Sequence, residues 1–229
     1  MANSSLELLK KIPCFAGLSP ELMELMSGGV EKVTFAKGEL ILMEGEPCPG
    51  LFIVQSGSVK LYRSSLEGDE QIVRIVHRGG CFECAPLFDK GPNPVSAEAL
   101  EPTELLLLPA SHFEALMTSN PQAVLQIVPM LAMRLRSMLN MIDDFSFRRV
   151  SCRLARLLLQ LSEKESEALV VSPHLPLNQQ HLACMLGCSR QLTNTSLRKL
   201  VESGVIEMKG RRIIVLNAEA LRKLAYPGV

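Results

Sequence analysis

Residues 177–200 read LNQQHLACMLGCSRQLTNTSLRKL, and this stretch decides the fold of the C-terminal part of the chain. It predicts two short helices joined by a tight turn. Gly187 stands where the first helix would end in a left-handed conformation, and Ser189 is placed to cap the second. We expect Leu192, Leu197 and Leu200 to face inward, which leaves a polar, basic outer face. A helix of this kind suits the major groove of DNA, whereas a buried helical hairpin needs no such face.

Charge is unevenly distributed along the 229 residues, although the total is zero. Residues 1–144 contain 11 Lys+Arg and 18 Asp+Glu, a net charge of −7, whereas residues 145–229 contain 13 and 6, a net charge of +7. This asymmetry predicts two domains, with a polyanionic partner bound to the C-terminal one. No apolar run of about 18 residues occurs and no signal-peptide core precedes the first domain, so we expect a cytoplasmic protein with no membrane contact.

Short strand-like segments dominate residues 30–108. Gly45, Gly57, Gly68 and Gly79 are separated by 12, 11 and 11 residues, a spacing typical of short strands joined by turns. The apolar segments between and beyond them are residues 40–42, 51–54, 59–62, 72–76 and 105–108. They predict an antiparallel β-roll of the jelly-roll type. We expect a helix that starts at residues 19–20 before the roll, and a helix capped by Ser111 after it.

A long helix is predicted from Pro121 onward. Its apolar residues recur at spacings of 4, 3, 4, 3 and 4, the pattern of a two-stranded coiled coil, and they are Val124, Val128, Leu131, Leu135, Met138 and Ile142. Other apolar residues lie off this seam, so we expect one face to pack on the β-roll and the other on a second copy of the chain. The predicted domains are residues 1–118, residues 119–144 as dimerisation helix and hinge, and residues 145–229.

The last domain contains further predicted elements. Residues 147–161 favour an amphipathic helix, and residues 163–167 a solvated loop or the fraying end of that helix. Residues 205–208 and 213–215 flank the basic tip KGRR, which predicts a hairpin.

These motifs resemble those of a known family. LACMLGCSRQ at 182–191, followed by LRKLVESGVIE at 197–207, resembles the winged helix-turn-helix of the CRP/FNR transcription regulators. GELILMEGEPCPGLFIVQSGSVKLYR at 38–63 resembles their β-roll sensor domain. The resemblance implies an α+β fold: an N-terminal antiparallel β-roll similar to cyclic-nucleotide-binding domains, a long dimerisation helix and a C-terminal winged helix-turn-helix. It also implies an effector-responsive regulator that binds palindromic double-stranded DNA as a homodimer and contacts RNA polymerase.

The resemblance places base-reading side chains at Arg190, Gln191, Asn194 and Thr195. Arginine pairs with guanine and glutamine with adenine through two hydrogen bonds each, whereas the short Thr195 departs from the arginine of the best-known members. We therefore expect a different half-site. The side chains expected to contact DNA phosphates are Ser189, Arg198, Lys199, Arg211 and Arg212.

In cyclic-nucleotide-binding members a cassette at the position of residues 82–97 holds the ligand. Cys84 stands where those members have a glutamate for the ribose, and Val95 where they have an arginine for the phosphate. Together with Glu83 and Ser96 these residues would form the effector pocket. A buried phosphate without a cation is costly, so tight cAMP binding is not expected.

The effector itself, a small molecule or a gas, is left open. Cys81 and Cys84 form a C-x-x-C pair, which suits a redox disulfide or a metal site completed by Cys48 or His77, but simple packing of small apolar thiols is as plausible. Haem stays open because nitric-oxide-sensing members also lack the cassette, and His77 and His112 are the available imidazoles. An iron–sulfur cluster is not expected, because the oxygen-sensing members of the family that this sequence resembles have a cluster of cysteines near the N-terminus. This sequence has only Cys14 there.

Two other classes of function fit the sequence less well. A jelly-roll enzyme of the cupin type needs paired histidines at short spacing, and the histidines of this sequence are isolated. A ligand-binding module without a DNA target would leave the basic C-terminal domain unexplained.

Overall fold

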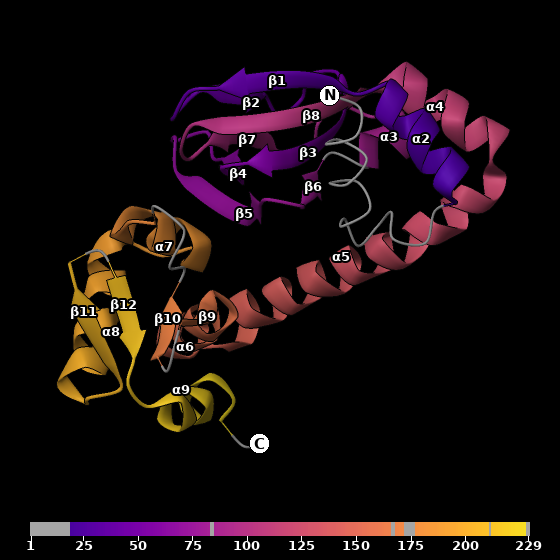
Figure 1. Cartoon of the computed structure of the whole chain (residues 1–229). Helices are drawn as coiled ribbons and strands as arrows, with labels where there is room; N and C mark the ends of the chain where they lie inside the picture. Colours follow the sequence, from indigo (N-terminus) through magenta and orange to yellow (C-terminus); the bar gives the residue numbers. More distant parts are fainter. Residues whose placement is uncertain (1–18, 83–84, 166–167, 172–176, 211, 228–229) are drawn as a thin grey trace. The chain divides into compact units, whose positions relative to one another are not determined.

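A computed structural model describes residues 19–82, 85–165, 168–171, 177–210 and 212–227 (Figure 1). The chain forms two compact units whose boundary along the long helix falls after Ser137. None of the helices in these ranges has the length and hydropathy that a bilayer crossing requires.

Two four-stranded sheets form the β-roll of the first unit, except for residues 70–72, at the start of the strand Glu70–His77 (β5), which group with the second unit. The predicted β-roll is confirmed. One sheet has the order β1 (Glu31–Phe35), β8 (Thr103–Pro109), β3 (Gly50–Ser56) and β6 (Cys81–Phe82). The other has the order β2 (Leu40–Leu42), β7 (Ser96–Ala99), β4 (Ser58–Ser64) and β5 (Glu70–His77). Pairs such as β3 with β8 and β4 with β7 are antiparallel.

Alternation along the strands divides the apolar side chains between two cores. Phe52, Val54 and Leu105 face the second sheet and pack with its Val59, Leu61 and Ala97. On the opposite face of the first sheet, Leu51, Ile53 and Leu108 pack against helices. These helices are α2 (Pro20–Gly28), α4 (Ala110–Ser119) and the first turns of α5 (Pro121–Phe147); the short α3 (Ala85–Asp89) contacts α4.

Two helix starts were predicted next to the roll. The start at residues 19–20 is confirmed, because α2 begins at Pro20. The prediction that Ser111 caps the following helix is wrong: α4 already begins at Ala110, and its N-cap position is Pro109, with no side-chain cap. Strand β8 runs directly into this helix, and the Ala110 N–H donates to the Pro49 carbonyl at 3.0 Å, which satisfies the first N–H group of α4.

The turn between β3 and β4 contains Gly57, where we predict that a substitution destabilises the fold. The φ of Gly57 is +84°, and an added Cβ would lie 2.5 Å from Thr103 Oγ1 and 2.7 Å from the Pro102 carbonyl oxygen. Gly38 has a similar φ of +80° with nothing within 4 Å of an added Cβ. We expect Gly38→Ala to lower the free energy of unfolding by about 1–2 kcal/mol, and Gly57→Ala to lower it by at least about 1 kcal/mol more. Denaturant unfolding of the full chain measures both changes. Equal losses would show that the turn relaxes freely.

One face of α5 is apolar and exposed in the single chain. Val124 and Leu131 pack against the helix-side core of the first unit, beside the buried Ala123 and Ile127. The exposed apolar side chains of this face of α5 are Leu125 (62% exposed), Val128 (49%), Leu135 (60%), Met138 (49%), Leu139 (56%) and Ile142 (58%). Of the predicted seam, Val128, Leu135, Met138 and Ile142 are therefore open to solvent.

The second unit is a helical domain with a small sheet. Its helices are α6 (Val150–Gln160), α7 (Gln179–Leu186), α8 (Arg190–Glu202) and α9 (Ala218–Ala225). Its sheet has the order β11 (Ile206–Lys209), β12 (Arg212–Val215), β10 (Ala168–Val171) and β9 (Ser162–Glu165). The predicted hairpin is thus confirmed. The expectation of a loop from residue 163 is wrong for residues 163–165, which pair with β10; residues 166–167 lie outside the described part.

Ion pairs connect the end of α5 to α6. The helix continues through Asp143 and Asp144, where a hinge was expected, to Phe147. Asp144 pairs with Arg148 at 3.0 Å and with the Arg156 guanidinium. Arg156 also lies over the Tyr226 ring, 4.8 Å from its centroid. These contacts join α5, α6 and the end of α9 within the second unit.

Candidate functional site

The turn between α7 and α8 is fixed by caps at both helices. At the start of α7, the Asn178 side chain accepts from the His181 N–H at 2.8 Å, and the Asn178 N–H donates to His181 Nδ1 at 3.4 Å, which forms a capping box. Gly187 ends the helix in the left-handed conformation at φ 58°. Ser189 Oγ then accepts from the Leu192 N–H at 3.2 Å, as predicted from the sequence.

The inner face of α8 differs from the expectation at one position. Leu197 and Leu200 are buried, but Leu192 is 45% exposed, so its prediction as an inward residue is wrong. Thr193 is fully buried instead. Residues 193, 197 and 200 lie on one helical face, and residue 192 is turned about 100° away. Thr193 Oγ1 donates to the Ser189 carbonyl at 3.2 Å and contacts Cys188 Sγ at 3.3 Å, which satisfies the buried hydroxyl.

The residues predicted to read bases lie together on the outer face of α8. Arg190, Gln191 and Thr195 are exposed, and Asn194 is half-buried. With Arg198 they line one open hollow. Thr195 Oγ1 donates to the Gln191 carbonyl at 3.0 Å, so its hydroxyl proton is committed to the helix, and its methyl group and the accepting side of its oxygen are left to meet a ligand.

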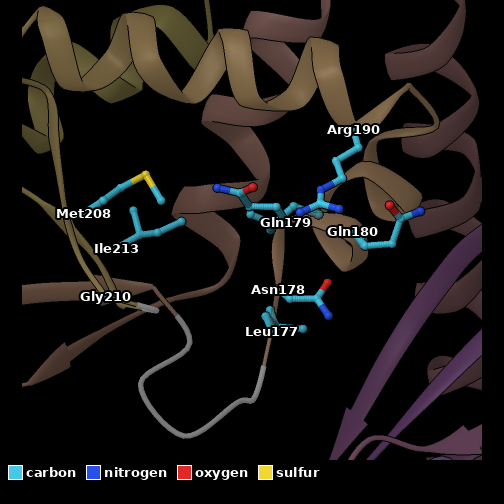
Figure 2. A pocket seen from close by; sticks show the side chains of 9 residues that line it. Leu177, Asn178, Gln179, Gln180, Arg190, Met208, Gly210 and Ile213 are labelled. Atoms are coloured by element: carbon cyan, nitrogen blue, oxygen red, sulfur yellow. The ribbon is translucent and has the colours of Figure 1, made fainter.

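A second hollow joins this face to the start of α7 and to the β11–β12 hairpin (Figure 2). It has a volume of about 320 Å³, and Arg190 leans across it toward Gln179. Asn178 and Gln180 line it from α7, and Gly210 from the tip of the hairpin. The sequence interpretation overlooked these α7 side chains, although the capping pattern that begins at Asn178 marks their position.

The predicted phosphate-contacting residues occupy different positions. Arg198 and Lys199 are exposed on α8, and Arg212 is exposed beside the tip of the hairpin, where it pairs with Lys209 in the strand register. Ser189 is engaged as the cap of α8. Arg211 lies outside the described residues. Lys209, which the sequence interpretation did not single out, is exposed on the same hairpin and pairs with Glu207 at 3.2 Å.

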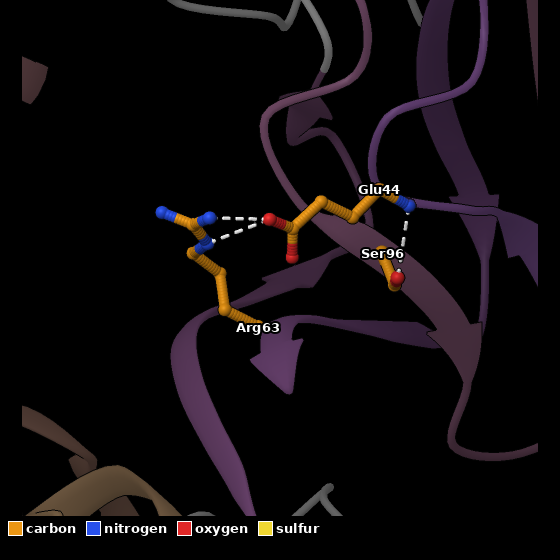
Figure 3. Close-up of polar contacts among 3 residues, drawn as sticks. All are labelled: Glu44, Arg63 and Ser96. Carbon is orange, nitrogen blue, oxygen red and sulfur yellow. Dashed lines mark hydrogen bonds and ion pairs between the residues drawn. The ribbon is translucent and has the colours of Figure 1, made fainter. Parts of the chain in front are cut away.

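The predicted effector pocket is described only in part, because Glu83 and Cys84 lie outside the described residues. Val95 and Ser96 are half-buried where β7 begins. Ser96 Oγ accepts from the Glu44 N–H at 3.0 Å, and the Glu44 carboxylate binds the Arg63 guanidinium (Figure 3). The hydrogen bond to Glu44 and its negative charge raise the pKa of Arg63.

The candidate metal and redox residues do not assemble into a described site. His77 is exposed, and His112 Nε2 lies 3.2 Å from the Leu25 carbonyl oxygen. Cys48 Sγ donates to the Gly50 carbonyl at 3.3 Å, and Cys81 is buried. Within the described ranges no three His, Cys, Asp or Glu side chains are grouped to hold a metal ion.

Comparison with known proteins agrees with this geometry. Residues 32–120 match the cyclic nucleotide-binding domain family, and residues 152–224 match the Crp-like helix-turn-helix domain family. The chain is 30% identical over 218 residues to the cyclic AMP receptor protein of Thermus thermophilus, which covers 95% of this chain and 99% of that protein. It is 29% identical over 223 residues to the CRP-like cAMP-activated global transcriptional regulator of Mycobacterium tuberculosis, covering 96% and 99%.

A solved structure shares the fold. FixK2 from Bradyrhizobium japonicum superposes with a TM-score of 0.77 at 22% identity, covering 87% of this chain and 99% of that one. The β-sensor, the long helix, the helix-turn-helix and these matches lead to one conclusion. The chain belongs to the CRP/FNR family and is a DNA-binding transcription regulator with an effector domain, and not an enzyme.

Proposed function

We propose that this protein binds an inverted-repeat DNA site as a homodimer and lays one α8 helix in each of two successive major grooves. The observation that supports this most is the outer face of α8, where Arg190, Gln191, Asn194, Thr195 and Arg198 line one hollow. The caps at Asn178 and Ser189 hold this face rigid, so little ordering free energy is lost on binding.

In this proposal the side chains divide into two roles. Arg190 pairs with guanine, Gln191 and Asn194 contact adenine or its neighbour, and the Thr195 methyl group meets an apolar base edge such as the thymine methyl. Arg198, Lys199, Arg211 and Arg212 hold phosphates, and the Ser189 cap orients the start of α8 toward the backbone. The hydroxyl contact of Thr195 with its own helix supports an apolar role.

The dimer contact in this proposal is the exposed apolar face of α5. Val128, Leu135 and Ile142 recur every seven residues, and Leu125 and Leu139 flank them at coiled-coil spacing. Val124 and Leu131 pack on the β-roll core instead. A second α5 laid along this face would remove six large apolar side chains from water.

The effector is proposed to differ from cAMP. Two relatives have names that include cyclic AMP, but Cys84 and Val95 replace the side chains that resemblance assigns to ribose and phosphate. We also propose that the protein acts in the cytoplasm and contacts RNA polymerase.

Selection of bound duplexes from a random pool tests the proposal. We expect one enriched inverted repeat whose two arms are identical and about one helical turn apart. A pool without an enriched repeat, with and without cell extract as a source of effector, would contradict it.

A further inference from the structure

Helix α5 is followed by α6 after only two residues, Arg148 and Arg149 (Figure 1). Arg149 has an extended backbone, with φ −65° and ψ 151°, so the two helices are not one continuous rod. A connection of this length leaves several soft backbone dihedral angles about which the helices can turn. Both helices contribute to the second unit, α5 with its last turns. Their relative direction must therefore be fixed by side-chain contacts.

The first such contact is made by the Asp144 carboxylate, near the end of α5. It pairs with Arg148 Nε at 3.0 Å and with the Arg156 guanidinium in the middle of α6. The side chains of Asp144 and Arg156 are only 19% and 15% exposed. Arg156 also lies over the Tyr226 ring at the end of α9. An ion pair that is mostly removed from water resists separation, because each charge would be left buried without its partner.

The second contact is made by the Phe145 ring, on the next residue of α5. A Cβ added to Gly187 would lie 3.3 Å from Phe145 Cε1, so the ring packs directly on the turn between α7 and α8. Arg153 of α6 lies over the same ring, with its guanidinium carbon 5.0 Å from the ring centroid. Because Gly187 has no side chain, the ring can approach the turn from which the DNA-reading helix starts.

Together the two contacts fix a direction that one contact could not. Asp144 and Phe145 are consecutive residues of a helix, so their side chains point about 100° apart. Asp144 holds α6, whose buried Leu154 and Leu158 share a core with Leu197 of α8. Phe145 holds the turn at the start of α8. The end of α5 can therefore neither roll nor tilt against the DNA-binding domain without breaking one of the two contacts.

We propose that Asp144 and Phe145 are positioning residues for DNA recognition, which hold α8 at one angle to the dimer helix and so restrict the protein to one spacing between the arms of its site. Each base pair moves an arm by about 3.4 Å along the duplex and by about 35° around it, so a small change of this angle takes α8 out of its groove. The inference rests on the proposed function, because arm spacing matters only when a homodimer binds an inverted repeat.

Binding of the full chain to a series of duplexes tests the inference. The series contains the selected site, the same site with one base pair added or removed between its arms, and a duplex with a single arm. For the wild type, we expect a one-base-pair change to lower affinity by at least about tenfold. In Asp144→Asn and in Phe145→Ala, affinity for the selected site should fall at least about tenfold, and the preference among spacings should shrink to about threefold or less. Single-arm binding should stay within about twofold of the wild type, since α8 itself is unchanged.

Two further variants serve as controls. Asp143→Asn removes the same charge from the preceding residue, whose side chain is 51% exposed and pairs with Arg148 at 3.5 Å. An exposed ion pair contributes little, so this change should leave the spacing preference as it is in the wild type. Asp144→Glu keeps the charge and should fall between the wild type and Asp144→Asn. Sedimentation equilibrium establishes whether each variant is still a dimer.

The outcomes separate positioning from support of the fold. Equal losses on single-arm and two-armed duplexes would show that Asp144 and Phe145 only stabilise the DNA-binding domain, which would overturn the inference. Variants that become monomers, or that keep the wild-type spacing preference, would overturn it as well. A wild type that has no preference among spacings would instead contradict the homodimer proposal, and this inference with it.

Discussion

Replacing Leu135 with glutamate is expected to turn the dimer into monomers and to weaken binding to a two-armed duplex by about 100-fold or more. Leu135 is 60% exposed in the single chain, at the middle of the apolar face of α5. A carboxylate there would be buried without a partner in the dimer, and each monomer would then bind only one arm. Sedimentation equilibrium gives the mass, and a mobility-shift titration gives the affinity.

Met133→Glu is the matched control for this change. Met133 is 62% exposed on the same helix, but it lies two residues from Leu135 and so points away from the apolar face. It introduces the same charge and should leave both mass and affinity within about twofold, as expected for a surface position. Equal effects of the two substitutions would show that the face of α5 containing Leu135 is not the dimer contact.

Arg190→Ala is expected to flatten the base preference at one position of each arm. The lost pair of hydrogen bonds is worth about 1–3 kcal/mol per arm, so the affinity of the dimer for the two-armed site should fall about 30-fold or more, while binding to unrelated duplex changes little. Arg190 is exposed at the first position of α8 and lines both hollows of the DNA-facing surface.

Lys199→Ala serves as the comparison, because Lys199 is also exposed but lines neither hollow. It should weaken binding to all sequences alike and reduce the steepness of log affinity against log salt by about two, one for each arm of the site. A sequence-dependent loss for Lys199→Ala, or a uniform loss for Arg190→Ala, would reverse the proposed roles. Selection with each variant, repeated at two salt concentrations, measures both effects.

Much of the fold was predictable because its signals are local. Gly187 and Ser189 lie next to the turn that they create, and the glycine spacing between residues 45 and 79 separates the strands of the roll. The elements that escaped prediction depend on distant partners. Strand β9 has the polar sequence SEKE and is a strand only because it pairs with β10. Helix α4 starts one residue before Ser111, where strand β8 ends, and the Pro49 carbonyl that receives the Ala110 N–H there is 61 residues away in the sequence.

The candidate sites also divide into features that follow from local sequence and features that depend on distant residues. The polar face of α8 follows from helical periodicity, but a one-residue error placed Leu192 inward instead of Thr193, since a buried threonine is plausible only when its hydroxyl partners at Ser189 and Cys188 are known. On the sensor unit, Arg74 of β5 and Arg134 of α5 both donate to the Cys81 carbonyl, although they are 60 positions apart in the sequence. No motif relates Arg74 to Arg134, so only the three-dimensional structure brings the two charges together.

The spacing of the two arms tests the central claim most directly. Five base pairs inserted between the arms of the selected site turn one arm by half a helical turn to the opposite side of the duplex. If the dimer places one α8 in each of two successive major grooves, the affinity should then fall to that of a single arm. Ten inserted base pairs return both arms to the same side of the duplex but increase the distance between them. Unchanged affinity with five inserted base pairs would contradict the account.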